Sequence, residues 1–186
     1  MTDGILPARP TSYDRKIGLV LQGGGALGSY QAGVYEALAS SEYLPDWVAG
    51  ISIGAINAAI IAGNAPKDRV QRLRSFWEGI TAPTTLWPPA PDGPLAAWQR
   101  RASALMALTL GQPGFFAPRP PQDWFSSDKC ISYYNTSALK ATLERLIDFD
   151  RINGAKETRL SVGAVNVRTS HFAYFDSEEI KIRPEQ

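Results

Sequence analysis

The residues with the clearest chemical potential are Ser52 and the glycines on either side of it. Gly50 and Gly54 place this serine in the pattern Gly-x-Ser-x-Gly. A short apolar run at residues 47–50 precedes it, and a small, apolar segment at residues 54–62 follows. This pattern forms a nucleophile elbow when a strand, a tight turn and a helix follow one another. The same pattern also occurs by chance in ordinary turns. The stretch therefore predicts a nucleophilic serine, with a helix N-terminus nearby that favours an oxyanion.

A second stretch of interest is the glycine turn, residues 22–28, which reads Gln-Gly-Gly-Gly-Ala-Leu-Gly. The apolar run before it, residues 17–21, suits a buried parallel strand. Residues 29–38 after it have helical spacing, with Ser29 as a candidate N-cap. Four glycines in six residues are more than one tight turn requires, so we expect the unobstructed backbone N–H groups of this turn to have a function.

Two functions fit the glycine turn. Gly23, Gly25 and Gly28 match the Gly-x-Gly-x-x-Gly dinucleotide fingerprint, which also needs an acidic residue about 20 positions later at the end of the next strand. Asp46 has that spacing, but it precedes the next predicted strand, and Ser52 follows its end. The other function is an oxyanion hole, because glycine N–H groups beside a nucleophile stabilise the charge of a tetrahedral intermediate. We favour the oxyanion hole and keep the nucleotide site as the alternative.

Residues 22–28 followed by residues 50–54, in this order and spacing, resemble the start of a patatin-like phospholipase domain. The resemblance is clear over about residues 17–80 and extends over residues 155–186. It implies a three-layer α/β/α fold with a mainly parallel sheet. It also implies a serine lipid acyl hydrolase with a Ser–Asp dyad in place of a triad, acting on acyl esters of lipids without a cofactor.

The resemblance assigns roles to individual residues of this chain. Ser52 takes the place of the nucleophile. The backbone amides of Gly23, Gly24 and Gly25, together with that of Ile53, take the place of the oxyanion hole.

The chain departs from the family where the catalytic aspartate is expected. The family carries it in an Asp-Gly-Gly or Asp-Gly-Ala motif late in the domain, whereas Asp-Gly occurs here only at Asp3 and Asp92. Neither aspartate is followed by Gly-Gly or Gly-Ala, and neither lies late in the domain. We therefore expect a domain that is incomplete at its C-terminus, lacks the base and is inactive alone. A non-catalytic lipid-binding fragment is a further alternative.

A Ser–His–Asp triad is the alternative to the dyad. The order Ser52, then Asp128, Asp148 or Asp150, then His171 would satisfy the chain order of many elbow hydrolases. His171 lies, however, between predicted strands at residues 159–167 and 171–176, where a hairpin turn would expose it to solvent. The dyad is therefore the preferred hypothesis.

Composition limits the other classes of function. The 186 residues carry a net charge of +1, which gives no field for nucleic acid. Cys130 is the only cysteine and His171 the only histidine, so we expect neither a disulfide nor a multi-histidine metal site. No apolar run suits a signal peptide or a membrane span, which favours a cytoplasmic protein, with membrane contact at most peripheral.

The chain divides into a flexible arm, residues 1–16, and one domain, residues 17–186. The domain contains a cap-like insertion at about residues 81–125, whose many prolines argue against regular sheet and confine helix to residues 95–110. That helix meets either lipid or the core, and we favour packing on the core because apolar helices are normally buried. Outside the insertion, residues 66–79 predict an amphipathic helix that places Arg69 among its polar positions, and residues 137–147 predict another helix.

Overall fold

The computed structural model describes residues 9–81, 92–112, 114–119, 134–154, 157–166 and 168–185. The chain forms two compact units: Met1–Phe76 together with Leu143–Gln186, and Trp77–Thr142. The first unit contains the glycine turn and Ser52. The expected insertion at residues 81–125 falls inside the second unit.

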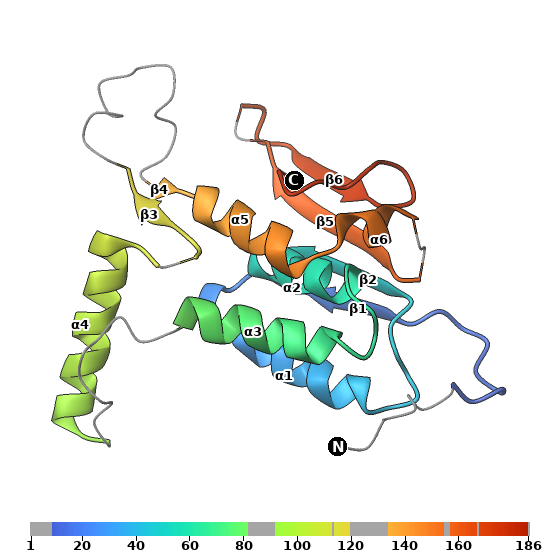
Figure 1. The fold of residues 1–186 in the computed structure, drawn as a ribbon, viewed down its shortest axis with the longest axis horizontal. Helices are drawn as coiled ribbons and strands as arrows, with labels where there is room; N and C mark the ends of the chain where they lie inside the picture. Colours follow the sequence, from blue (N-terminus) through green and yellow to red (C-terminus); the bar gives the residue numbers. More distant parts are fainter. Residues whose placement is uncertain are drawn as a thin grey trace. The chain divides into compact units, whose positions relative to one another are not determined.

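A four-stranded sheet is the framework of the first unit. Its strands lie in the order β1 (Gly18–Leu21), β2 (Trp47–Ile51), β5 (Arg159–Val165) and β6 (Phe172–Asp176) (Figure 1). The first three strands are parallel, and β6 is antiparallel to β5. The prediction of a mixed α/β fold with a mainly parallel sheet is therefore confirmed.

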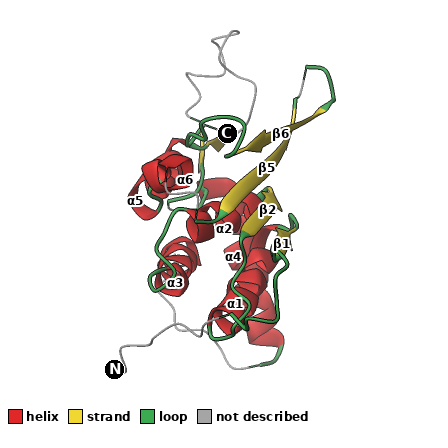
Figure 2. Ribbon diagram, turned by 90° about the vertical axis from the view of Figure 1, so that its right-hand side faces the viewer, coloured by secondary structure: helices red, strands yellow, loops and turns green. Residues whose placement is uncertain are grey.

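Helices fill the connections between these strands. The first unit contains the 3-10 turn η1 (Gly25–Leu27) and the helices α1 (Gly28–Ala39), α2 (Ile53–Ala62) and α6 (Phe149–Gly154). The helices α3 (Arg69–Thr81) and α5 (Ser137–Leu146) each cross the boundary between the units. Both α2 and α6 lie on one side of the strands (Figure 2).

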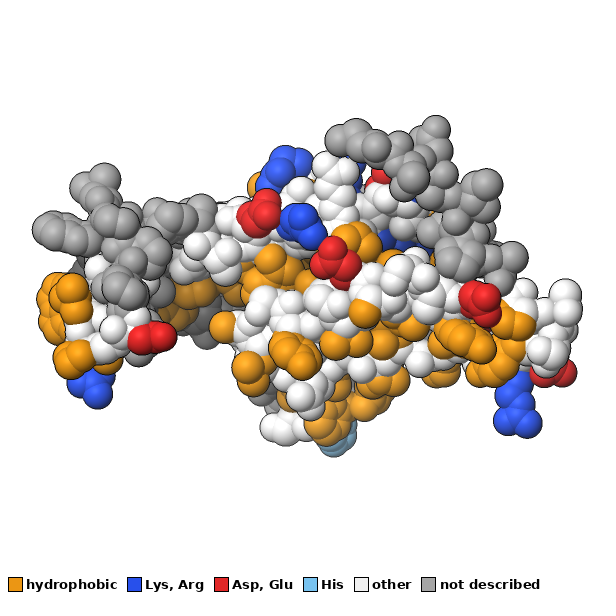
Figure 3. All heavy atoms as spheres, turned by 90° about the horizontal axis from the view of Figure 1, so that it is seen from below, with side chains coloured by type: hydrophobic (Ala, Val, Ile, Leu, Met, Phe, Trp, Pro, Cys, Tyr) orange, Lys and Arg blue, Asp and Glu red, His pale blue; other side chains and the backbone are white. Residues whose placement is uncertain are grey.

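Helix α2 packs tightly on the sheet because its residues are small or apolar. Ala58, Ile60 and Ile61 are fully buried, and so is Val48 of β2. The opposite face of the sheet instead exposes apolar side chains, of which Val20 is 80% exposed. Exposed hydrophobic side chains are widespread on the surface seen in Figure 3. Among the described elements of this unit no helix covers that face, so the second helical layer of a three-layer fold stays a prediction.

Two expectations about helix starts are wrong. Ser29 does not cap α1, which begins at Gly28; its Oγ instead donates a hydrogen bond to the Ala26 carbonyl at 2.8 Å. The physical reason is that η1 runs directly into α1, so the backbone is already helical before Ser29. The helix expected from residue 66 begins at Arg69, after a turn at residues 66–68.

The second unit contains α4 (Pro94–Leu110) and a two-stranded antiparallel ladder of β3 (Ala117–Pro118) and β4 (Tyr134–Asn135). The ladder corrects the expectation that prolines exclude sheet here. Pro118 has no N–H to donate, but β3 is a two-residue edge strand, where a missing donor costs little. Helix α4 exposes Leu95, Trp98 and Leu105, while Ala96 is buried. None of the described helices has both the length and the apolar character needed to cross a bilayer.

Candidate active site

Ser52 lies at the carboxyl end of β2, directly before α2. Its backbone has φ 55° and ψ −127°, and among the described residues other than glycine only Ser170 shares a positive φ. Such a conformation costs roughly 1–3 kcal/mol for a side-chain-bearing residue, so the surrounding structure must hold it. The side chain is exposed. A strained, exposed serine between a strand and a helix has the geometry of a nucleophile elbow.

The glycines on either side of Ser52 are required by close packing. A Cβ on Gly50 would lie 2.5 Å from the Ala55 nitrogen and even closer to the Gly54 carbonyl. A Cβ on Gly54 would lie 2.6 Å from the Leu21 carbonyl carbon. Real Cβ atoms do not approach backbone atoms this closely, so only glycine fits at both positions. Through these contacts α2 is pressed against β1 and β2 at the point where Ser52 turns outward.

The glycine turn lies beside Ser52. Strands β1 and β2 pair in parallel with Leu21 opposite Gly50, so both strands end at the same edge of the sheet. A Cβ on Gly23 would lie 3.2 Å from Ser52 Cβ and 3.9 Å from Ser52 Oγ. The structure therefore brings the two sequence motifs together, as parallel pairing predicts.

Several backbone N–H groups of the glycine turn and of the start of α2 have no protein acceptor among the described residues. Within the described residues, the N–H groups of Gly23, Gly24 and Gly25 donate to no protein acceptor. Gly25 has φ 56°, a left-handed conformation that glycine adopts without strain. The N–H of Ile53, in the first turn of α2, likewise has no protein acceptor among the described residues, as is usual at a helix N-terminus.

Two side-chain amides behind the glycine turn were not predicted from the sequence. Asn57 Nδ2 donates to the Gly28 carbonyl at 2.9 Å and to Gln31 Oε1 at 3.0 Å. Gln31 Nε2 in turn donates to the Gln22 carbonyl at 2.7 Å. Asn57 is only 1% exposed. A single polar residue within the apolar segment at residues 54–62 was the available signal, because a buried amide must find partners.

Of the residues of the alternative triad, Asp148 and His171 do not meet Ser52 in the described part of the chain. Asp148 is bonded through its N–H to the Gly63 carbonyl at 3.0 Å, beyond the far end of α2, which is about 15 Å long. His171 is exposed and lies in the β5–β6 turn, two strands and roughly 10 Å across the sheet from β2. Asp128 lies outside the described residues. Ser52 Oγ itself bonds to no other side chain in the part of the chain that the structure describes.

The acidic residue of the dinucleotide alternative lies at the wrong edge of the sheet. Asp46 Oδ2 accepts hydrogen bonds from the Ile17 N–H at 2.8 Å and from Arg9 Nη2 at 2.9 Å. Because Asp46 precedes β2, this carboxylate is at the amino end of the strands, opposite the glycine turn. Arg9 is thereby anchored, while residues 1–8 of the expected arm lie outside the described residues.

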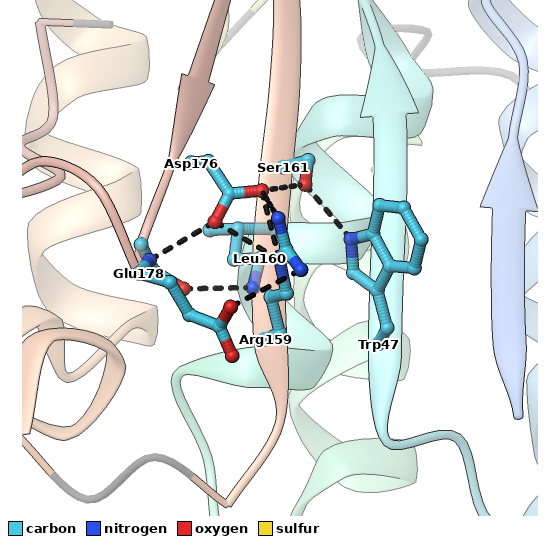
Figure 4. A network of polar contacts seen from close by, with 7 residues as sticks. Trp47, Arg159, Leu160, Ser161, Asp176 and Glu178 are labelled. Carbon is cyan, nitrogen blue, oxygen red and sulfur yellow. Dashed lines mark hydrogen bonds and ion pairs between the residues drawn. The ribbon is translucent and has the colours of Figure 1, made fainter. Parts of the chain in front are cut away.

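A cluster of polar side chains also lies toward the amino edge. Arg159 Nε donates to both carboxylate oxygens of Asp176, and Arg159 stacks 4.7 Å from the centre of the Trp47 ring (Figure 4). Ser161 Oγ donates to Asp176 and accepts from Trp47 Nε1 at 2.8 Å. Burial alone would raise the pKa of Asp176, but hydrogen bonds from Arg159, Ser161 and the Glu178 N–H hold that pKa below its usual value. The cluster joins β2, β5 and β6 and is remote from Ser52.

The surface next to the glycine turn is apolar. Leu27 is 72% exposed, and Tyr30 and Val34 follow it on the exposed side of α1. A hollow of about 510 Å³ on this helix is lined by Ser29, Tyr30, Gly33, Val34 and Ala37. No group of three or more His, Cys, Asp or Glu side chains within the described ranges is placed to hold a metal ion.

The chain is similar in sequence to a known protein family. A family model described as Patatin-like phospholipase matches residues 19–181, which include both motifs. Over 81 residues the chain is 40% identical to Lysophospholipase nte1 of Aspergillus terreus, a match that covers 38% of this chain and 5% of that protein. The crystal structure of VipD from Legionella pneumophila is similar with a TM-score of 0.37 and 13% identity, covering 99% of this chain and 46% of that chain. The chain thus spans a small part of the curated relative that it matches.

Proposed function

The chain belongs to the patatin-like phospholipase family, and we propose that Ser52 is the nucleophile of an enzyme that hydrolyses carboxylic esters of lipids. The observation that carries the proposal is the position of Ser52, strained and exposed, against a glycine turn whose N–H groups have no acceptor among the described residues. Acyl transfer needs these two parts within reach of one carbonyl group.

The proposed reaction proceeds through an acyl-enzyme. Ser52 Oγ attacks the ester carbonyl carbon while an aspartate takes its proton, as the family resemblance implies. The N–H groups of Gly23, Gly24, Gly25 and Ile53 hold the oxyanion of the tetrahedral intermediate. The C–O bond to the alcohol then breaks, and the alcohol leaves with the proton. Water attacks the acyl-enzyme in the same way and releases the fatty acid and free Ser52.

A lipid substrate is supported by the surface beside the glycine turn. The acyl chain is covalently joined to the reacting carbonyl, so it must leave the site across a neighbouring surface. Leu27, Tyr30 and Val34 offer apolar area there, and none of the side chains named around the α1 hollow is charged. Burial of apolar area contributes roughly 25 cal/mol per Å², which favours a hydrocarbon chain over a polar group.

The test replaces the nucleophile and keeps a matched serine as control. In the protein expressed from its complete reading frame, Ser52→Ala should abolish both p-nitrophenyl ester hydrolysis and labelling by a fluorophosphonate probe. Ser170→Ala removes the other positive-φ serine, which is exposed in a distant turn, and should retain both. Labelling that persists in Ser52→Ala would overturn the assignment. A protein that labels at neither serine but binds lipid vesicles would favour the non-catalytic alternative.

The nucleotide-binding alternative is less well supported. Asp46, the acidic residue that this alternative needs, is occupied by the Ile17 N–H and Arg9 at the opposite edge of the sheet. Thermal unfolding with added dinucleotide separates the two hypotheses, because a ligand at 100 times its Kd stabilises a protein by about 2.7 kcal/mol. An unchanged Tm is expected.

We further propose a peripheral contact between α4 and a membrane surface. Leu95, Trp98 and Leu105 form an exposed apolar stripe at helical spacing, and Trp98 is 66% exposed. Aromatic and aliphatic side chains on one helix face insert into the lipid headgroup boundary. Trp98→Ser with Leu105→Ser should therefore reduce co-sedimentation with phosphatidylcholine–phosphatidylserine vesicles, whereas Val20→Ser, at an exposed apolar residue of the sheet, should not. Equal sedimentation of all forms would exclude this contact.

A further inference from the structure

Gln31 joins the glycine turn to the buried side of α2. Its Nε2 donates to the Gln22 carbonyl at 2.7 Å, and its Oε1 accepts from Asn57 Nδ2 at 3.0 Å. The second hydrogen of Asn57 Nδ2 goes to the Gly28 carbonyl at 2.9 Å. We call Gln31 and Asn57 the amide bridge, since together they connect both ends of the glycine turn to α2.

The bridge acts on the peptide unit that leads into Gly23. A peptide unit is planar and trans, so the Gln22 C=O and the Gly23 N–H point in opposite directions. Gln31 holds the carbonyl end, and a Cβ on Gly54 would lie 2.7 Å from the same Gln22 oxygen. The carbonyl is therefore fixed from two sides, and the direction of the Gly23 N–H is fixed with it. Without these contacts a glycine peptide rotates readily, because glycine has few steric limits.

The amide of Gln31 is the group that this position requires. It must accept a hydrogen bond from Asn57 and donate one to Gln22, and a primary amide does both at once. A carboxylate of the same shape accepts but has no hydrogen to donate, and an aliphatic side chain does neither. We propose that Gln31, oriented by Asn57, is a positioning residue that sets the direction of the Gly23 amide in the oxyanion hole. This inference rests on the proposed ester hydrolysis at Ser52.

The experiment compares Gln31→Glu and Gln31→Leu with the wild type in the protein from its complete reading frame. Loss of one oxyanion donor typically costs about 100- to 1000-fold in turnover. A donor that is present but misdirected should lower the turnover by a smaller factor than a missing donor. We therefore expect kcat to fall about 10- to 100-fold in both variants with little change in KM. Gln71→Glu makes the same chemical change at an exposed position of α3 and should leave kcat unchanged.

A pH series distinguishes positioning from a general structural role. When the carboxyl introduced by Gln31→Glu is protonated, its O–H can donate to the Gln22 carbonyl again. The ratio of variant to wild-type kcat should therefore rise as the pH falls toward about 4.3, the ordinary pKa of a glutamate, whereas the Gln31→Leu ratio should stay flat. Dividing by the wild type at each pH removes the titration of the catalytic base.

The outcomes separate this inference from the proposed function. Ser52→Ala is assayed alongside; if it retains activity, the assignment of Ser52 is wrong. If Ser52→Ala is inactive while Gln31→Glu and Gln31→Leu keep wild-type kcat, the positioning role alone is overturned. A loss of kcat that merely parallels a fall in Tm, with no rise of the Gln31→Glu ratio at low pH, also overturns it. Circular dichroism melts of all variants supply the Tm.

Discussion

At the scale of single residues, the conformation of Ser52 depends on neighbouring glycines, which have no side chain. Its left-handed backbone is held between Gly50 and Gly54, and the absence of a Cβ on Gly23 leaves room for its side chain. A Cβ on Gly23 would lie 3.2 Å from Ser52 Cβ, which is tighter than nine in ten real Cβ contacts. The glycine turn therefore contributes both hydrogen-bond donors and space.

The first residue-scale prediction concerns this space. Gly23→Ala should push the glycine turn and Ser52 apart by a few tenths of an ångström and misplace both nucleophile and donors. We expect kcat to fall at least about 10-fold, because small displacements of reacting groups have large kinetic effects. Gly79→Ala is the control, since its added Cβ would meet no atom within 4 Å. Steady-state kinetics of both variants measure the difference, and equal kcat values would contradict the steric argument.

A second residue-scale prediction follows from Asp176. Arg159 and Ser161 hold its pKa below the usual value in the folded protein, so this carboxylate stabilises the fold when ionised. That contribution is complete above the unfolded pKa of about 3.9 and is lost as the pH falls through the lower, folded pKa. Asp176→Asn should therefore lower the free energy of unfolding at pH 7 and differ less from the wild type near pH 3. Urea unfolding at both pH values tests this; a constant difference would contradict it.

At the scale of elements, the elbow is a junction of β1, β2 and α2. Gly54 lies at the start of α2, where its Cα faces the carbonyl groups at the end of β1. Gly54→Ala should force α2 away from the sheet. Overpacking a core typically costs about 1–3 kcal/mol, and a clash with backbone that has no rotamer to yield should reach the upper end of that range. Urea unfolding should show a clearly lower midpoint than that of Gly23→Ala, and a wild-type midpoint would disprove the close packing.

The sequence predicted the elements of the first unit well, because apolar runs and helical spacing are local signals. Parallel pairing then placed the ends of β1 and β2 together and explains why Gly23 and Ser52 were expected as neighbours. The burial of Arg69 is a feature that local sequence signals did not predict. Its position among polar residues of a predicted amphipathic helix suggested exposure, yet it is 2% exposed.

Two of the three partners of Arg69, Tyr35 and Thr158, come from distant parts of the chain and therefore left no local signal. It donates to the Asn64 carbonyl at 3.0 Å, to Tyr35 Oη at 3.3 Å and to Thr158 Oγ1 at 2.9 Å. Burial raises the pKa of Tyr35, although the charge of Arg69 works against that rise. Gln31 was missed for the same reason, since its bond to Asn57 joins residues of two helices.

At the scale of the whole molecule, the proposed reaction needs a base that activates Ser52. A serine hydroxyl is a weak nucleophile without a neighbouring proton acceptor. Among the described residues no side chain bonds to Ser52 Oγ, and Asp148 and His171 lie far from it. The Asp-Gly-Gly or Asp-Gly-Ala motif implied by the family resemblance does not occur in residues 1–186.

The last prediction is that residues 1–186 alone hydrolyse esters poorly even though Ser52 and the glycine turn are formed. A longer form of the protein that carries an Asp-Gly-Gly or Asp-Gly-Ala motif should exceed it in kcat by at least about 1000-fold, since removal of a catalytic base from a serine hydrolase leaves only a residual activity due to the oxyanion hole and binding. Both forms are assayed on a short p-nitrophenyl ester, with Ser52→Ala of each as the blank. Equal activity of the two forms would place the base within these 186 residues, and His171→Ala would then decide whether a histidine supplies it.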